Sequence, residues 1–364
     1  MEEMKKPLLA SILVPSVQEL VKEKICSVPQ RYVHHDVDED LVISEADGVV
    51  EIPVIDMHRL LSIEFGDSEL SKLHSACKEW GFFQVVNHGV SSSLVEKVKL
   101  EIKDFFNLPM VEKKKFWQSS ENVEGFGHVF GASEEQKLDW ADMLYMTTLP
   151  KHMRVPHLFP QFPLPFRDTL ELYSEELKKL GMNIIAQMGK ALKMEEKEMR
   201  ELFEDGTQTM RMNYYPPCPE PEKVIGLTPH SDGAGLTILL QVSEVEGLQI
   251  RKDGIWVPVK PLPNSFIINL GDMLEIISNG IYQSIEHRVM VNSEKERLSI
   301  ATFYSPRFDG IVGPAPSLIT EQSPAQFKTI GVQEYRRGLF ASKLEGKSYR
   351  DIMRINHHMI KVDS

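Results

Sequence analysis

The chain has 364 residues, 42% of them apolar, and a formal net charge of −12 at pH 7. This length is enough for one large domain, or two closely packed ones, with a substantial hydrophobic core. The acidic balance argues against nucleic acid or an anionic membrane as the main partner, because like charges repel. No apolar stretch approaches the ~20 residues that a membrane-spanning helix needs. We therefore expect a soluble protein whose partner is a small molecule, and we also expect a monomer.

The three cysteines, Cys26, Cys77 and Cys218, are widely spaced and form no CxxC pair. An odd number of cysteines without short spacings indicates neither a disulfide framework nor a zinc site. This pattern agrees best with a reducing compartment, and we expect the protein in the cytoplasm.

The amino terminus resembles a signal peptide only superficially. Lys5 and Lys6 precede the apolar run "PLLASILVPSV", but no small-x-small cleavage site follows. Ser16 and Glu19 have the spacing of a capping box that opens the charged helix "VQELVKEKI". We expect an amphipathic packing segment and no targeting sequence.

The first half of the chain is predicted to be largely helical. Apolar residues at helical spacing predict a long helix over about 168–194, and Gly81 ends an earlier helix over 69–80. Ser93 and Glu96 predict the start of another helix that runs to Pro109. The early strands are predicted at "IPVID" (52–56) and "FFQVVNHG" (82–89).

The second half changes character from about Thr209 to Tyr304. Short apolar and β-branched runs alternate there with turn residues. The predicted strands are "MRMNYY", "LTILLQV", "LQI", "WVPVK", "FIINL", "HRVMV" and "LSIATFY". Such evenly spaced strands suggest a sandwich or jelly roll, and the residues after about 324 return to a helical pattern.

The stretch "LTPHSDGAGLT" places two metal-ligand side chains, His230 and Asp232, two positions apart. This HxD pattern alone is weak, because His34 and Asp36 form a second match in an acidic segment with no strand pattern. His287 strengthens the first match, since it opens the strand "HRVMV" in the same β region. Two histidines and one carboxylate that meet at the mouth of a barrel leave coordination positions open, as Fe(II) and oxygen chemistry requires.

Arg297 and Ser299, in "ERLSIATF", are candidates for binding a carboxylate. If "NSEK" (292–295) is a hairpin turn, His287 lies opposite residue 299 or 300, and in the former register all three side chains share one face. A guanidinium beside an open metal position is a bidentate carboxylate receptor. The alternative is an exposed strand arginine.

Asn213 and Tyr215 alternate on one face of the strand "MRMNYY" before Pro216 and Pro217 end it. An amide and a phenol would then project together into the barrel mouth. The alternative, with one surface tyrosine and one core tyrosine, stays open on spacing alone.

These features come together in a resemblance. The HxD…H…RxS order and the stretches "NYYPPCPEP", "EIPVIDM", "KEWGFFQVVNHGV", "FFNLPMVEKKKFW", "EGFG" and "KLDWADM" resemble the plant 2-oxoglutarate- and Fe(II)-dependent dioxygenases. The resemblance extends over nearly the whole chain. It is strongest to the senescence-related-gene group, in the neighbourhood of the poppy alkaloid O-demethylases.

The resemblance implies an α+β protein with a mainly β core, a double-stranded β-helix or jelly roll. It would have an N-terminal helical region (1–200), the jelly-roll core (205–310) and a C-terminal helical segment (311–364). The implied ligands of Fe(II) are His230, Asp232 and His287.

The resemblance also implies how 2-oxoglutarate binds. The cosubstrate would chelate the iron, and its far carboxylate would pair with Arg297 and Ser299, aided by Tyr215, with Asn213 nearby. Ascorbate is the expected reductant. The products would be succinate, CO2 and a hydroxylated or O-demethylated small aromatic or polycyclic plant metabolite such as a flavonoid, coumarin or alkaloid.

Aromatic residues are candidates for the walls of a substrate pocket. The resemblance places Phe303 against the organic substrate, and Phe126, Phe130, Tyr145 and Met146 are further candidates. Two rival classes stay open: an iron oxidase of the same fold that does not consume 2-oxoglutarate, and a jelly-roll binding protein without catalysis.

Overall fold

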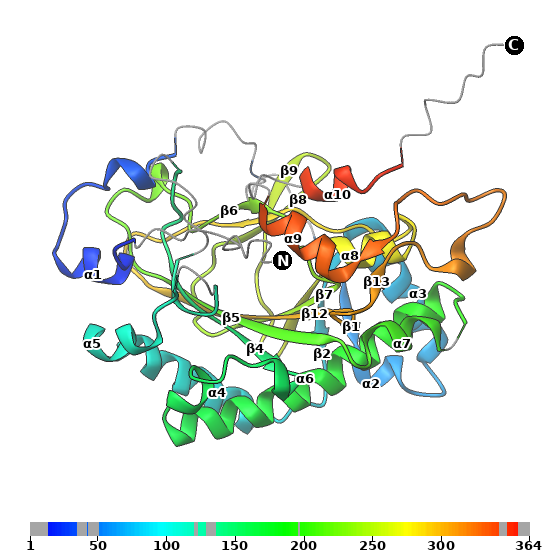
Figure 1. The fold of residues 1–364 in the computed structure, drawn as a ribbon, viewed down its shortest axis with the longest axis horizontal. Coiled ribbons are helices and arrows are strands. Elements are labelled where there is room, and N and C mark those ends of the chain that lie inside the picture. The colour runs from blue at the N-terminus through cyan, green and yellow to red at the C-terminus, as the bar shows by residue number, and fades with distance from the viewer. Residues whose placement is uncertain are drawn as a thin grey trace, which may run out of the picture.

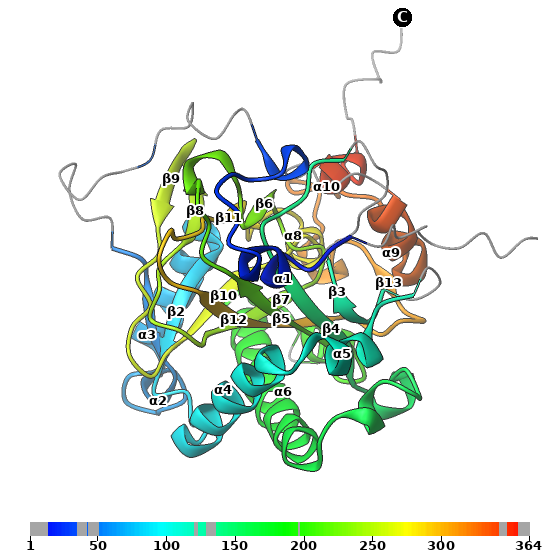
Figure 2. The same cartoon turned by 90° about the vertical axis from the view of Figure 1, so that its left-hand side faces the viewer.

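The computed structural model describes residues 14–34, 42, 51–119, 123–128, 136–195, 197–341 and 348–355. Two β-sheets face each other, and helices cover the outer face of the larger sheet (Figure 1). Figure 2 shows the same layers from the side, with α4 and α6 beneath the large sheet and β6, β8 and β9 above it. The helix, sheet and sheet layers confirm the predicted jelly roll with added helices.

The larger sheet has eight strands in the order β1-β2-β10-β7-β12-β5-β4-β3. The strands are Val54–Asp56 (β1), Phe82–Val86 (β2), Gly125–Gly127 (β3), Asp142–Leu149 (β4), Thr207–Tyr215 (β5), Leu236–Gln241 (β7), Phe266–Leu270 (β10) and Arg297–Ser305 (β12). The smaller sheet has the order β6-β11-β8-β9, with strands Leu227–His230 (β6), Leu248–Lys252 (β8), Ile255–Pro258 (β9) and His287–Val289 (β11). Ile311–Val312 (β13) pairs with Ile330–Gly331 (β14). All strands predicted between Thr209 and Tyr304 are present.

The helices lie mostly before β5 and after β12. They are Val17–Lys22 (α1), Met57–Leu60 (α2), Gly66–Ser75 (α3), Ser92–Asn107 (α4), Met110–Lys113 (α5), Leu164–Ala191 (α6), Glu198–Phe203 (α7), Asp272–Ile277 (α8), Val332–Ala341 (α9) and Ser348–Ile352 (α10). Short 3₁₀ helices span Gln30–Tyr32, Lys114–Phe116, Lys151–Met153, Phe159–Gln161, Pro221–Lys223 and Pro316–Leu318. None of the helices in the described ranges combines the length and the hydropathy of a transmembrane segment.

Helix α6 is the long helix that the sequence predicted. Its residues Leu170, Tyr173, Leu177, Leu180 and Ile184 are all buried. Their spacing of three and four residues places them on one face of the helix, which packs against the large sheet. This apolar layer supports the sheet from outside, while the opposite face of the sheet lines the barrel.

Two helix boundaries test the predicted end signals. Gly81 has φ 60° and ends a π-helical turn (Ala76–Trp80) that continues α3, as predicted. A side chain there would clash with the backbone oxygen of Gln283. The prediction for α4 was wrong by two residues: its N-cap is Ser91, not Ser93, and the Ser91 side chain makes no capping bond to the backbone.

The start of α1 agrees with the sequence. Ser16 caps the helix and accepts a hydrogen bond from the backbone of Glu19. The carboxylate of Asp142 in β4 accepts bonds from the Ser16 hydroxyl and from the backbone amides of Val17 and Gln18, at 2.6, 2.9 and 3.0 Å. An anion at a helix N-terminus is stabilised by the exposed amides, so α1 is held against β4.

Strands β3 and β4 were not predicted. Along β4, Leu144 and Met146 face the helices, whereas Met143 and Tyr145 face the barrel. Because most β4 side chains are buried on either face, the sequence lacks the polar and apolar alternation that marks a half-exposed strand.

Candidate active site

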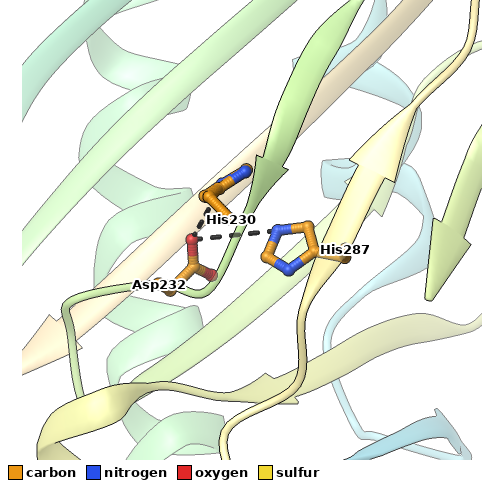
Figure 3. Close-up of side chains that lie close together, drawn as sticks. All are labelled: His230, Asp232 and His287. Atoms are coloured by element: carbon orange, nitrogen blue, oxygen red, sulfur yellow. Dashed lines mark ion pairs between the residues drawn. The ribbon is translucent and has the colours of Figure 1, made fainter. Parts of the chain in front are cut away.

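His230, Asp232 and His287 meet at one end of the smaller sheet. His230 is the last residue of β6, Asp232 follows in the next loop, and His287 opens β11. Strands β6 and β11 are antiparallel neighbours in which His287 pairs directly with His230, so the two imidazole rings lie 4.3 Å apart. Figure 3 shows the carboxylate of Asp232 turned toward both rings.

The donor atoms of the three side chains point to a common centre. Asp232 Oδ1 lies 3.5 Å from His230 Nε2 and 3.9 Å from His287 Nε2. His230 Nδ1 lies 2.8 Å from the carbonyl of Thr228, and His287 Nδ1 lies 3.3 Å from the carbonyl of Ile285. A carbonyl can only accept, so these contacts favour the tautomer that leaves each Nε2 lone pair free for a metal.

Asp232 is held with one oxygen turned away from the histidines. Thr237 Oγ1 and Asn269 Nδ2 both donate to Asp232 Oδ2, each at 2.6 Å. Burial acts to raise the pKa of the Asp232 carboxyl group, but His287, His230 and the Thr237 hydroxyl outweigh it, and the pKa lies well below its usual range. The carboxylate is therefore ionised at neutral pH, with Oδ1 left as the donor.

The surroundings of His287 favour the neutral form of its imidazole. Burial, and next the neighbouring His230, lower the pKa of the His287 imidazole to about 4. Two imidazole nitrogens and one carboxylate oxygen, all within 4.8 Å of one another, suit a divalent transition metal. A metal held on this one face keeps its other positions free for ligands.

The predicted carboxylate receptor lies beside this centre, on neighbouring strands of the large sheet. Arg297 pairs with Tyr215 and Ser299 pairs with Asn213 across β12 and β5. Arg297 is 2% exposed; its Nη1 donates to Ser299 Oγ at 3.4 Å and its Nη2 to Gln241 Oε1 at 3.2 Å. Its Nε and the Asn213 Oδ1 are buried without a hydrogen-bond partner. Such unpaired polar atoms indicate a place for a polar ligand.

The predicted alternation of Asn213 and Tyr215 is confirmed, because both side chains line the cavity that contains the triad, Arg297 and Ser299. Tyr214 faces the other way and stacks on Phe106 in the helix layer. Both tyrosines are buried, at 6% and 1% exposure, so the alternative with a surface tyrosine is wrong.

The predicted hairpin between His287 and Arg297 is also wrong. Strand β11 pairs with β6 and β8 in the smaller sheet, whereas β12 pairs with β5 and β7 in the larger one. Residues 290–296 therefore connect the two sheets and form no hairpin turn. His287 and Arg297 still line one cavity, because the inner faces of the two sheets enclose it.

A second cavity of about 140 Å³ adjoins the first and shares His230 and Asp232 with it. His230 and Asp232 form its inner wall, and Tyr145 of β4 and Phe303 of β12 supply aromatic surface. The remaining lining residues come from β4, β5, the loop after β6, α8, β12 and α9: Met143, Thr209, Arg211, Ser231, Gly233, Ala234, Met273, Ser305, Arg336 and Leu339. A planar organic molecule in this cavity would lie directly beside the metal position.

The candidates for aromatic walls divide between pocket and core. Phe303 and Tyr145 line the second cavity as predicted. The prediction was wrong for Phe126 and Met146, because both are buried in the core beneath the large sheet. Phe130 lies outside the described residues.

Comparison with known proteins decides the family. Residues 206–306 match the family model of the 2OG-Fe(II) oxygenase superfamily, and residues 52–162 match that of the non-haem dioxygenase in morphine synthesis N-terminal region. The chain is 60% identical to Protein SRG1 of Arabidopsis thaliana, over 95% of this chain and 98% of that protein. The chain belongs to the 2OG-Fe(II) oxygenase superfamily. It is an oxygenase that uses Fe(II) and 2-oxoglutarate.

Other relatives of this oxygenase agree with the resemblance found in the sequence. It is 55% identical to oxoglutarate-dependent flavonoid 7-O-demethylase 1 of Ocimum basilicum, over 95% of this chain and 92% of that one. It is also 55% identical to thebaine 6-O-demethylase of Papaver somniferum, over 94% and 96%. Among solved structures, JOX2 in complex with 2OG, Fe and JA superposes with a TM-score of 0.86, at 36% identity over 95% of this chain and 99% of that one.

Thr237 and Asn269, which position Asp232, were missed in the sequence because neither belongs to a recognisable motif. We expect Thr237→Val and Asn269→Leu each to weaken Fe(II) binding by this oxygenase about 10- to 100-fold, since loss of an outer hydrogen bond frees the carboxylate to rotate. Anaerobic titration with Fe(II) measures the change. Thr302→Val is the matched control, because Thr302 is equally buried but has no hydrogen-bond partner for its hydroxyl. Equal affinities in all three variants would contradict the role.

Proposed function

We propose that this oxygenase hydroxylates a C–H bond of a small aromatic or polycyclic plant metabolite, and that an O-methyl carbon is its preferred target. The main observation that supports this proposal is the cavity lined by Tyr145 and Phe303, which also includes His230 and Asp232 in its lining. The flavonoid and alkaloid O-demethylases among its relatives support a methyl ether as the reacting group.

We propose the following roles for the residues. His230, Asp232 and His287 hold Fe(II) from one side, with each imidazole oriented by a backbone carbonyl and the carboxylate oriented by Thr237 and Asn269. When bound, Fe(II) and 2-oxoglutarate supply the oxidising power that places an oxygen atom from O2 on the substrate carbon.

The cosubstrate is oriented by the buried end of the first cavity. Arg297 and Ser299 bind the far carboxylate of 2-oxoglutarate, the Tyr215 hydroxyl contributes a hydrogen bond, and Asn213 lies beside the molecule. The low accessibility of Arg297 strengthens this pairing, because water does not compete for the guanidinium.

The atoms balance for both hydroxylation and O-demethylation. One oxygen atom of O2 enters the substrate as a hydroxyl group and the other enters succinate, while 2-oxoglutarate loses CO2. If the hydroxylated carbon is an O-methyl carbon, the hemiacetal formed breaks its C–O bond and releases formaldehyde and the free hydroxyl compound. Hydroxylation and demethylation thus use the same residues.

A substrate panel tests this function. We expect the purified protein with Fe(II), 2-oxoglutarate and ascorbate to convert at least one methoxylated flavonoid, coumarin or alkaloid, with one succinate released per product. Mass spectrometry distinguishes an added oxygen from a lost methylene, and a formaldehyde assay confirms demethylation. Turnover without succinate would instead indicate an oxidase that does not consume 2-oxoglutarate. Conversion of an aliphatic acid or a protein side chain alone would refute the aromatic substrate.

We also propose a monomer in the cytoplasm, with a small-molecule substrate and no nucleic-acid partner, and an organisation into residues 1–200, 205–310 and 311–364. All three cysteines lie in the described ranges and are unpaired, which supports a reducing compartment. The net charge of −12 supports a protein that does not bind nucleic acid.

A further inference from the structure

Arg211 is a second arginine on the inner face of the barrel. It lies on β5 two residues before Asn213, so its side chain points to the same face. Its direct neighbours across the sheet are Tyr145 of β4 and Ala301 of β12. The small side chain of Ala301 leaves room for the long arginine beside it.

The guanidinium of Arg211 has unsatisfied donors. Its Nε and Nη2 are buried and have no hydrogen-bond partner. Arg350, by contrast, binds both oxygens of the buried Glu275 at 3.1 Å. Burying guanidinium donors without acceptors is unfavourable, so Arg211 is poorly explained by stability alone.

Arg211 stands where the two cavities of the active site meet. It lines the cavity of Arg297 and also the cavity of Tyr145 and Phe303. Along the inner face of β5 and β12 the order is Arg297 and Tyr215, then Ser299 and Asn213, then Arg211, then Phe303. Arg297 therefore lies two pairs away from Arg211 on one side, whereas Arg211 is level with Tyr145 and one pair before Phe303 on the other.

The charged residues of the second cavity favour an oxygen acceptor over a cationic amine. Among its described lining residues, Arg211 and Arg336 are cationic, and Asp232, a proposed metal ligand, is the carboxylate. Glu124 interacts electrostatically with Arg336, so part of that charge is offset. Within the described residues, no carboxylate forms an ion pair with Arg211. A cationic amine in this cavity would meet like charge, whereas an oxygen acceptor would meet free donors.

We propose that Arg211 binds an acidic or hydrogen-bond-accepting oxygen of the organic substrate, a phenol or a carboxylate, and thereby selects such compounds against those that carry a cationic amine at the same place. This inference rests on the proposed aromatic substrate and specifies its chemistry. Arg211 is in this view a specificity residue that orients the substrate with its reacting carbon toward the triad. The other acceptor within its reach is 2-oxoglutarate, and the experiment separates the two.

Direct binding under argon tests the inference without turnover. The Fe(II)- and 2-oxoglutarate-loaded enzyme is titrated by calorimetry with three probes of one shape: a methoxynaphthol, the matching methoxynaphthoate and the matching methoxynaphthyl methylamine. We expect the wild-type enzyme to bind at least one oxygen probe more tightly than the amine. Arg211→Met should weaken that probe at least ~10-fold, and Arg211→Lys should weaken it less, because one charged donor remains. Whether the naphthol or the naphthoate binds better distinguishes a phenolic from a carboxylate substrate.

The control is Arg200→Met, since Arg200 is an exposed arginine on α7, 62% exposed at its side chain. Unchanged probe affinities in Arg211→Met would overturn the inference, as would tightest binding of the amine. So would a weaker affinity for 2-oxoglutarate with unchanged probe affinities, which would assign Arg211 to the cosubstrate. Absence of binding by every probe would refute both the aromatic substrate and the inference. Arg211-dependent binding with no turnover in the substrate panel would leave the inference supported and reject only the reaction.

Discussion

Asp232→Ala is expected to abolish tight Fe(II) binding and all turnover. Asp232 supplies the one carboxylate donor of the triad, and its removal leaves only the imidazoles of His230 and His287. The truncation also leaves the buried donors of Thr237 and Asn269 without their acceptor. Anaerobic Fe(II) titration measures the binding, and succinate release in the presence of a converted substrate measures the turnover.

The control for this prediction is Asp67→Ala. Asp67 is fully exposed in the first turn of α3 and far from the triad in the fold, so its loss should change neither iron binding nor turnover. Circular dichroism of both variants shows whether the fold is kept. Succinate release at the wild-type rate by Asp232→Ala would mean that the metal is held elsewhere.

The strands of the barrel could be predicted because their signals are local. Period-two alternation in "MRMNYY" placed Asn213 and Tyr215 on one face, and this face lines the cavity that contains the triad and Arg297. The triad could be assembled because HxD and a later strand histidine are residue types with few other uses in that combination. A pattern that is set by residues close together in the sequence is therefore reproduced in the structure.

The pairing of strands that are distant in the sequence could not be predicted. A short polar connection before Arg297 has the composition of a hairpin turn, yet in this fold it crosses from one sheet to the other. Both routes use the same local residues, and only the partners β5, β7, β6 and β8 decide between them. The alternation of side chains along a strand correctly placed Arg297 and Ser299 on one face. The predicted hairpin, which was to bring Arg297 beside His287, does not exist.

The residues that support the site were hidden for a related reason. Asn269 is the one polar residue of the strand "FIINL", and Arg211 shares the strand "MRMNYY" with Asn213. Asn269 acts through a contact across the barrel, its bond to Asp232, and the role proposed for Arg211 depends on the cavities that it lines. A polar residue at an inward position of a predicted barrel strand is the one signal that could have identified them.

Substitution of Arg297 is expected to act mainly on 2-oxoglutarate. Arg297→Lys keeps a positive charge but loses the planar fork that matches a carboxylate, and Arg297→Ala leaves the far carboxylate buried without a cation. Loss of a buried charge-assisted pair costs on the order of 2–5 kcal/mol, which corresponds to a rise in half-saturation of roughly 30-fold to several thousand-fold. The alanine variant should lie toward the upper end of this range and the lysine variant toward the lower end.

The measurement is a cosubstrate titration at saturating organic substrate, with succinate as the readout. Fe(II) affinity without 2-oxoglutarate should stay close to wild type, because Arg297 contacts Ser299 and Gln241 and none of the three metal donors. A parallel loss of iron binding would therefore indicate a damaged fold and not a lost carboxylate receptor. Arg251, on β8 with its side chain 41% exposed, provides matched lysine and alanine controls. An unchanged half-saturation for 2-oxoglutarate in both Arg297 variants would remove this residue from the cosubstrate site, and the buried guanidinium would then need another partner.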